Sequence, residues 1–356
     1  MTELLRVPAV ALRTTVERAF SALGMPAEDA AISADALIEA DLMGISSHGV
    51  SNYIQLIYAP GLRSGSIVAQ PEIRVVRDGG CALLVDGGSG MGHVVGHRAM
   101  RLAIEKAKMH GVGLATVRNS RHYGAAGYYA LLAAREGCIG ISMTNADALV
   151  LPTHGRDARL GTNPIALAAP TGEQPLFLLD MATSTVPLGK IMLAARAGQR
   201  IPKGWAADER GRPTTDPEVA FEALRLLPLG GTYEQGSHKG YGLALLVDVL
   251  AGALSDGIAR GGAVGGSVGH FFCAVDVEAL RPLDEFRASM DELLQTMQET
   301  PRVDEAEPVI YPGWKEHHAR LDREANGIPL HPKVVEYLNG LCDELGVEPA
   351  WAASGP

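Results

Sequence analysis

The chain has 356 residues and a formal net charge of −10, and 47% of its residues are hydrophobic. An acidic chain without a block of Lys or Arg does not favour binding to nucleic acid or to an anionic membrane surface. Because the length exceeds what one compact core usually serves, we expect two domains. The four cysteines are scattered and suggest neither a disulfide framework nor a metal site, so we expect a cytoplasmic protein.

The predicted elements change character twice along the chain. Apolar residues at helical spacing predict helices over residues 9–42, and a short helix follows His48. From about residue 73, short β-branched runs alternate with helices, which predicts an α/β layer with a mixed or parallel sheet. From about residue 282 the pattern is helical again. We therefore predict a helical domain built from both chain ends, residues 1–72 and 282–356, beside an α/β domain, residues 73–281.

Two stretches near the end of the α/β region carry further expectations. Residues 238–254 predict a buried helix, and the Gly-rich residues 257–270 predict a surface loop or an ordered turn. No apolar run reaches the roughly 20 residues that a membrane span needs. We therefore expect no transmembrane segment.

A glycine-rich stretch, VDGGSGMGHVVG over residues 85–96, follows a predicted strand. The G-x-G-x-x-G spacing fails in every frame, and the next predicted strand ends without the acidic residue that would hold a ribose. We therefore reject the standard dinucleotide fold and expect a tight turn from strand to helix. His93 and His97 share one helix face, but no third ligand is apparent, so we expect structural or surface histidines.

Two histidines lie on predicted loops. DLMGISSHGVSNY, residues 41–53, places Ser47 and His48 where a long helical pattern ends. A histidine on such a glycine-flanked turn can reach a ligand, or it can be a helix-end residue that faces water. His122 lies between a predicted strand and a predicted helix, where a neutral imidazole would suit proton transfer near pH 7. The alternative for His122 is simple packing near the helix start.

Polar and small residues lie at the ends of the predicted strands. Hydroxyl groups and backbone amides there would suit a ribose or a pyrophosphate, although each could equally be turn chemistry. Lys239 lies at the start of an apolar helix, a costly place for a cation unless it meets an anion or a carbonyl. The strand-end residues are Ala146, Asp147, Thr162, Asn163, Asp180, Thr183 and Ser184.

Several motifs, in one order over nearly the whole chain, resemble the malate/L-lactate dehydrogenase family. This non-Rossmann group also includes ureidoglycolate, sulfolactate and diketogulonate oxidoreductases and cyclic imino acid reductases. The resemblance implies a homodimeric enzyme that uses NAD or NADP on an unusual α/β domain. The motifs are SHG at 47–49, HYGAAGYYA at 122–130, GTNPIALAAP at 161–170, DMATS at 180–184, PTTDP at 213–217, HKGYGLALLVD at 238–248 and YPG at 311–313.

The resemblance also implies site residues. His48 and His122 match the two active-site histidines of the family, which act as proton donor or acceptor in different members. For the substrate we expect contacts with Ser47, Asn52, Asp147, Thr162 and Asn163. For the cofactor we expect contacts with Ala146, Asp180, Met181, Ala182, Thr183, Ser184, Lys239 and Gly313.

Two departures from the family pattern concern the substrate and the cofactor. The family usually has Arg four residues after the SHG histidine, where a guanidinium can grip a carboxylate, and this chain has Asn52. Arg63 or Arg121 could take over that contact. After YPG the family usually has an acidic residue, and this chain has Trp314 and Lys315.

The leading hypothesis is an NAD(P)-dependent oxidoreductase of a small 2-oxo/2-hydroxy acid. The alternatives are a reductase of cyclic or N-alkyl 2-imino acids, and a catalytically weakened homologue that binds nucleotide.

Overall fold

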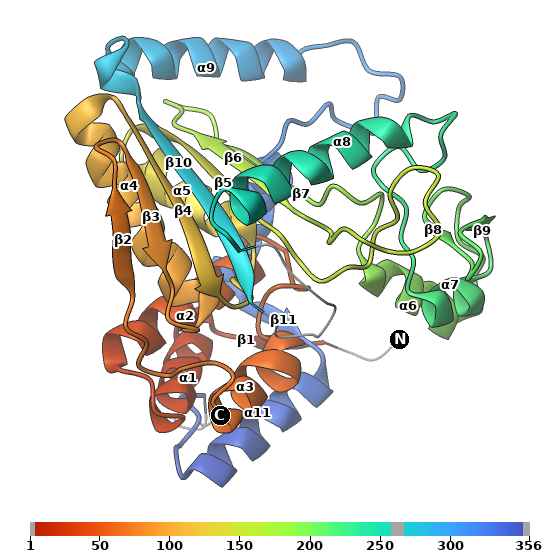
Figure 1. Ribbon diagram of the computed structural model, residues 1–356, viewed down its shortest axis with the longest axis horizontal. Helices are drawn as coiled ribbons and strands as arrows, with labels where there is room; N and C mark the ends of the chain where they lie inside the picture. Colours follow the sequence, from red (N-terminus) through yellow and green to blue (C-terminus); the bar gives the residue numbers. More distant parts are fainter. Residues whose placement is uncertain (1–3, 258–266, 352–356) are drawn as a thin grey trace.

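The centre of the computed structural model, which describes residues 4–257 and 267–351, is a seven-stranded sheet (Figure 1). The strand order is β2-β3-β4-β10-β5-β6-β7. β3 and β4 pair in parallel and the other neighbours pair antiparallel, so the predicted mixed sheet is confirmed. The strands are β2 (Arg74–Asp78), β3 (Ala82–Asp86), β4 (Val112–Ser120), β5 (Cys138–Thr144), β6 (Ile165–Ala169), β7 (Phe177–Met181) and β10 (Val268–Asp276).

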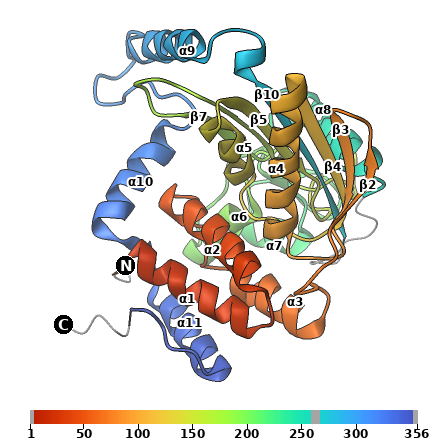
Figure 2. The ribbon, with the colours of Figure 1, turned by 90° about the vertical axis from the view of Figure 1, so that its left-hand side faces the viewer.

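Helices cover both faces of the sheet (Figures 1 and 2). On one face lie α4 (Gly92–His110) and α5 (Ala126–Arg135), where small residues allow close packing. A Cβ at Gly96 of α4 would lie 2.7 Å from the ring of Tyr129. On the other face lie α8 (Ser237–Val247) and the π-helix η2 (Asp248–Ala253).

We predicted a buried helix over residues 238–254, but one face of this helical segment is exposed. Val247 and Ala251 pack on the sheet, whereas Val249 and Leu254 are 58% and 56% exposed. Several apolar residues of this segment are therefore exposed in the single chain, and its apolar sequence does not by itself indicate burial. Of the Gly-rich stretch predicted to be a loop, residues 258–266 lie outside the described residues. None of the helices in the described ranges is long and apolar enough to span a membrane.

Segments from both chain ends form a helical group below the sheet (Figure 2). β1 pairs antiparallel with β11, and Glu39 of α2 binds Arg135 of α5 and Arg320 of α10. The elements are β1 (Leu5–Val7), α1 (Ala9–Ala22), α2 (Ala27–Leu42), the π-helix η1 (Ile54–Tyr58), α3 (Ala59–Ser64), α10 (Trp314–Asn326), β11 (Ile328–Leu330) and α11 (Pro332–Leu345).

Two parts lie outside these layers. The helix α9 (Leu283–Gln298), which follows the short 3-10 helix η3 (Val277–Ala279), lies at the far end of the sheet, where Asp291 accepts N–H groups of residues 172–174 (Figure 1). A small lobe between β7 and α8 has its own apolar cluster, which includes Ile191, Ala206 and Leu226. Its elements are α6 (Leu188–Ala197), β8 (Ala206–Ala207), β9 (Pro213–Thr214) and α7 (Pro217–Ala223).

Candidate active site

His48 lies on a tight turn directly after α2. The helix ends at Leu42, Gly44 takes a left-handed φ of 83°, and the N–H of His48 donates to the carbonyl of Ile45 at 2.9 Å. The hydroxyl of Ser47 lies 2.9 Å from Nδ1 of His48. Burial lowers the pKa of the His48 imidazole to about 4, so the ring is neutral at pH 7.

His122 lies in the loop between β4 and α5, and its Nδ1 atom has two neighbours that can donate. The hydroxyl of Tyr58 lies 2.7 Å from Nδ1, and the backbone N–H of Gly124 donates to Nδ1 at 3.4 Å. Burial, together with the nearby His48, lowers the pKa of His122 well below its usual range. Because a backbone N–H can only donate, Nδ1 must accept, and the neutral ring carries its proton on Nε2.

The two histidines lie together although they come from different layers. Their ring centroids are 5.9 Å apart and the ring planes differ by only 13°. The ring of Tyr53 contacts both, with centroid distances of 4.4 Å to His122 and 5.4 Å to His48. The site therefore lies at the seam between the helical group and the sheet layer.

Two further histidines lie buried next to this pair. His93 of α4 packs against the ring of Tyr58 at 4.8 Å, and its two ring nitrogens have no hydrogen-bond partner within the described residues. His270 of β10 bonds Thr144 through Nδ1 and Ser120 through Nε2. Burial lowers the pKa of each imidazole to about 3. Both are therefore neutral, and we assign them to the packing behind His122.

The two histidines of α4 each lie beside a tyrosine ring. His93 is fully buried, and Nδ1 of His97 lies 3.0 Å from the hydroxyl of Tyr128. In the part of the chain that the structure describes, no three His, Cys, Asp or Glu side chains are grouped as metal ligands.

Sequence reasoning missed Tyr53, Tyr58 and His270. The two tyrosines lie in an apolar run, and Tyr58 ends the π-helix η1. A π-helix often marks a functional site, but its presence cannot be derived from residue spacing. His270 ends the Gly-rich stretch that we predicted to be a loop or a turn, whereas it is a buried residue of β10, so the prediction is wrong for residues 268–270.

Many of the residues predicted to bind cofactor or substrate lie in one hydrogen-bonded patch at the end of β7. Thr183 donates to the carbonyls of Thr162 and Asn163, and the side chain of Asn163 accepts the N–H of Ala146. The hydroxyls of Thr183 and Ser184 are buried and bond to protein carbonyls. Met181 and Ala182, by contrast, are partly exposed.

Three other predicted residues adjoin this patch. Asp180 accepts the N–H of Gly127 at 2.7 Å, close in sequence to the His122 loop, and burial raises its pKa to about 6. A Cβ at Gly313 would lie 2.8 Å from the backbone nitrogen of Leu178 in β7. Lys239 is exposed at the start of α8. Its neighbour Gly240 packs on Leu229, whose N–H donates to Thr183.

The remaining predicted contacts are less constrained. Asn52 is exposed, and burial raises the pKa of the partly exposed Asp147. The two candidate replacements for the missing arginine are engaged elsewhere. Arg63 pairs with Glu344 at 2.7 Å, and Arg121 donates to the carbonyls of Ser66 and Ser120.

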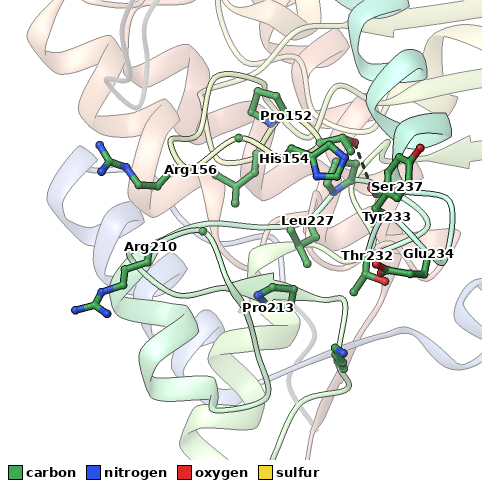
Figure 3. Close-up of a pocket in the computed structure, with 17 residues that line it drawn as sticks. Pro152, His154, Arg156, Arg210, Pro213, Leu227, Thr232, Tyr233, Glu234 and Ser237 are labelled. Carbon is green, nitrogen blue, oxygen red and sulfur yellow. Dashed lines mark hydrogen bonds between the residues drawn. The ribbon is translucent and has the colours of Figure 1, made fainter.

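A cavity of about 500 Å³ lies in the small lobe, apart from the histidine pair. The rings of His154 and Tyr233 lie against each other in a tilted arrangement, with centroids 4.7 Å apart. The side chains of Arg156 and Arg210 point away from the other labelled residues (Figure 3). The two guanidinium groups therefore do not converge with the other labelled residues, and we assign the chemistry to the histidine pair.

Comparison with known proteins identifies the family of this chain. The family model for malate/L-lactate dehydrogenase matches residues 7–339. The malate dehydrogenase of Pyrococcus horikoshii is 47% identical over 350 residues, which cover 97% of this chain and 96% of that protein. The L-sulfolactate dehydrogenase of Methanocaldococcus jannaschii is 39% identical over 332 residues, covering 91% and 92%. The crystal structure of malate dehydrogenase from Entamoeba histolytica has a TM-score of 0.91 at 33% identity, covering 97% and 99%. The chain therefore belongs to the malate/L-lactate dehydrogenase family and is an oxidoreductase.

Proposed function

We propose that the enzyme transfers hydride between NAD or NADP and a small 2-oxo/2-hydroxy acid, with His48 and His122 as acid/base residues. The observation that carries the proposal is the pair of neutral, parallel imidazoles 5.9 Å apart at the seam of two layers. Relatives named for malate and sulfolactate support the substrate class.

The residues around β7 fit a dinucleotide cofactor. The partly exposed Asp180 offers a carboxyl group that could hold ribose hydroxyls, and Lys239 offers a cation for a phosphate. Glycine at 313 leaves no side chain between its loop and β7. When bound, the nicotinamide supplies or accepts the hydride.

The two histidines have different partners, and this difference suggests their roles. With its proton on Nε2, His122 can donate a hydrogen bond to the carbonyl oxygen of a 2-oxo acid, where negative charge develops during reduction. His48 shares Nδ1 with the hydroxyl of Ser47, which can donate or accept. The His48 ring can therefore take either tautomer and accept the proton of a substrate hydroxyl during oxidation.

The test is turnover of His48→Ala and His122→Ala with NADH and NADPH on a panel of 2-oxo acids and cyclic 2-imino acids. Loss of a proton-transfer group should lower kcat by about 100-fold or more. Circular dichroism should show an unchanged fold. Near-normal turnover of both variants would contradict the mechanism, and activity on the imines alone would favour the alternative substrate class.

We propose further that Asn52 makes malate- and lactate-type compounds poor substrates. An amide offers no charge, so the enzyme forgoes a charge-assisted contact worth about 1.5–3 kcal/mol to a substrate carboxylate. Arg63 and Arg121 bond to other groups, which supports this proposal. Asn52→Arg should raise kcat/KM for oxaloacetate relative to the parent enzyme. A ratio at or below one would show that residue 52 does not contact the carboxylate.

We also propose a cytoplasmic homodimer. Exposed apolar side chains of α8, of η2 and of the residue that follows η2 form a surface suited to a second subunit; they include Leu245, Leu246, Val249 and Leu254. The four free cysteines fit a reducing compartment. Light scattering should give a dimer for the parent protein and a smaller mass for Val249→Glu. Equal masses for the two proteins would show that this face is not the dimer interface.

A further inference from the structure

We infer that Asp41 is a positioning residue for His48, because its buried carboxyl group holds the turn that carries the imidazole. The inference rests on the proposed role of His48. It concerns a residue that contacts neither substrate nor reacting atoms.

The carboxyl group of Asp41 bonds across the turn. Asp41 is 0% exposed in the last turn of α2, and its Oδ2 atom accepts the N–H of Val50 at 2.9 Å. This hydrogen bond links two residues nine positions apart, and His48 lies between them. Among the described residues, no other side chain of α2 forms a hydrogen bond with the backbone just after His48.

Gly49 makes the contact tighter than the hydrogen bond alone. A Cβ placed on Gly49 would lie 2.0 Å from Oδ1 of Asp41, so a larger residue fits only if the Asp41 carboxyl group or the turn moves. Gly49 thus lies in close contact with the same carboxyl group that binds Val50. The Asp41 carboxyl group therefore contacts the residue next to His48.

The other side of the turn is held from the C-terminal segment. The guanidinium of Arg323 in α10 donates to the carbonyl of Asp41 and to the hydroxyl of Ser46 at 3.3 Å. Asp41 and Arg323 therefore hold the turn on both sides of Ser47 and His48.

A buried carboxyl group at this position lowers the stability of the fold, which suggests that it is kept because it holds the turn. It lies at the negative end of the α2 dipole, and its Oδ1 atom has no hydrogen-bond partner among the described residues. An alanine or leucine would fill a buried helix end without that cost. The contacts with Val50 and Gly49 are what Asp41 provides and an apolar residue could not.

The variants Asp41→Ala, Asp41→Asn and Gly49→Ala test the inference, with Asp29→Ala as the matched control. Asp29 is also a buried carboxylate of α2, but it pairs with Arg98 at the opposite end of the helix. Asp41→Ala should lower kcat about 10- to 100-fold, because a misplaced catalytic group loses that much, and KM should change little. Asp41→Asn keeps an oxygen acceptor for Val50 and should retain kcat within about threefold.

A second readout does not depend on activity. In NMR spectra of histidine-labelled protein, the pKa of His48 should rise from about 4 toward its usual 6.5 in Asp41→Ala and Gly49→Ala, because the displaced turn exposes the ring. Asp29→Ala should leave it unchanged. If Asp41→Ala does not fold, Gly49→Ala provides the same test of kcat and pKa.

The outcomes separate this inference from the proposed function. If His48→Ala retains normal turnover, the role of His48 itself is wrong. If His48→Ala is impaired while Asp41→Ala and Gly49→Ala match Asp29→Ala in kcat and in the His48 pKa, only the positioning inference is overturned. Adding Asp41→Ala to His48→Ala should lower the residual kcat no further, and a full additional loss would also overturn it.

Discussion

Replacing Asp41 with Asn should change how the stability of the fold depends on pH. Burial raises the pKa of the Asp41 carboxyl group from its usual 3.8 to about 7, although the N–H of Val50 and the charge of Arg323 oppose the shift. Between these two pH values, the unfolded chain has lost this proton and the folded chain keeps it. The contribution of the group is therefore fully present below pH 3.8 and is lost as the pH rises to about 7.

The size of the effect follows from the shift. One pKa unit corresponds to about 1.4 kcal/mol, so between pH 5 and pH 8 the parent protein should lose about 3 kcal/mol of unfolding free energy through this group. Asn at position 41 cannot ionise. The stability of Asp41→Asn relative to the parent should therefore rise by about 3 kcal/mol over this interval, whatever the substitution costs at pH 5.

Urea unfolding of both proteins at pH 5, 6, 7 and 8, at one protein concentration, measures this difference. Asp322→Asn is a useful control, because hydrogen bonds from Arg6 and Asn326 lower the pKa of the exposed Asp322. Removing that group should not produce a gain that grows with pH. A stability difference between Asp41→Asn and the parent that stays constant from pH 5 to pH 8 would refute a neutral, buried Asp41.

Three further expectations concern the site itself. Tyr58→Phe removes the O–H donor to His122 and should lower kcat/KM about 5- to 30-fold, the equivalent of about 1–2 kcal/mol. The Tm should change little. An unaffected kcat/KM would show that Gly124 alone fixes the His122 ring. In the oxidation direction, the pH profile of kcat/KM should fall on its acidic side with a midpoint near the His48 pKa of about 4. A midpoint near 6.5 that disappears in His48→Ala would contradict the lowered pKa of that ring. Lys239→Ala should raise the cofactor Kd about fivefold or more without lowering the Tm of the cofactor-free protein. The control Lys333→Ala should change neither quantity. An unchanged Kd in Lys239→Ala would show that Lys239 does not bind the cofactor.

The layers of the fold could be predicted from periodicity and turn residues. The change from helical spacing to short β-branched runs near residue 73 locates the start of the sheet, and β2 begins at Arg74. The failed G-x-G-x-x-G spacing correctly excluded the standard dinucleotide fold, which has a mostly parallel sheet, because only β3 and β4 pair in parallel among the seven strands described. These features depend on local sequence, which the chain itself displays.

The parts that escaped prediction depend on contacts between distant segments. The apolar run that holds Tyr58 indicates a helix but not that its hydroxyl meets His122, 64 residues later in the chain. The exposure of Val249 follows from which face of η2 meets the sheet. The helix α9 lies apart from the other C-terminal helices, and its Asp291 binds the loop between β6 and β7. Periodicity identifies an apolar segment but does not say what will cover it.

The position of the site at a seam explains why its geometry can exist before any ligand binds. Adjacent residues of α4 serve different cores, since Val94 packs with the helical group and Val95 with the sheet layer. The hydrogen bond from Tyr58 to His122 crosses the same boundary. Because α4 belongs to both cores, the two layers cannot slide without disrupting packed side chains. The histidines are then held at their separation by the fold, and binding need not supply the entropy of bringing them together.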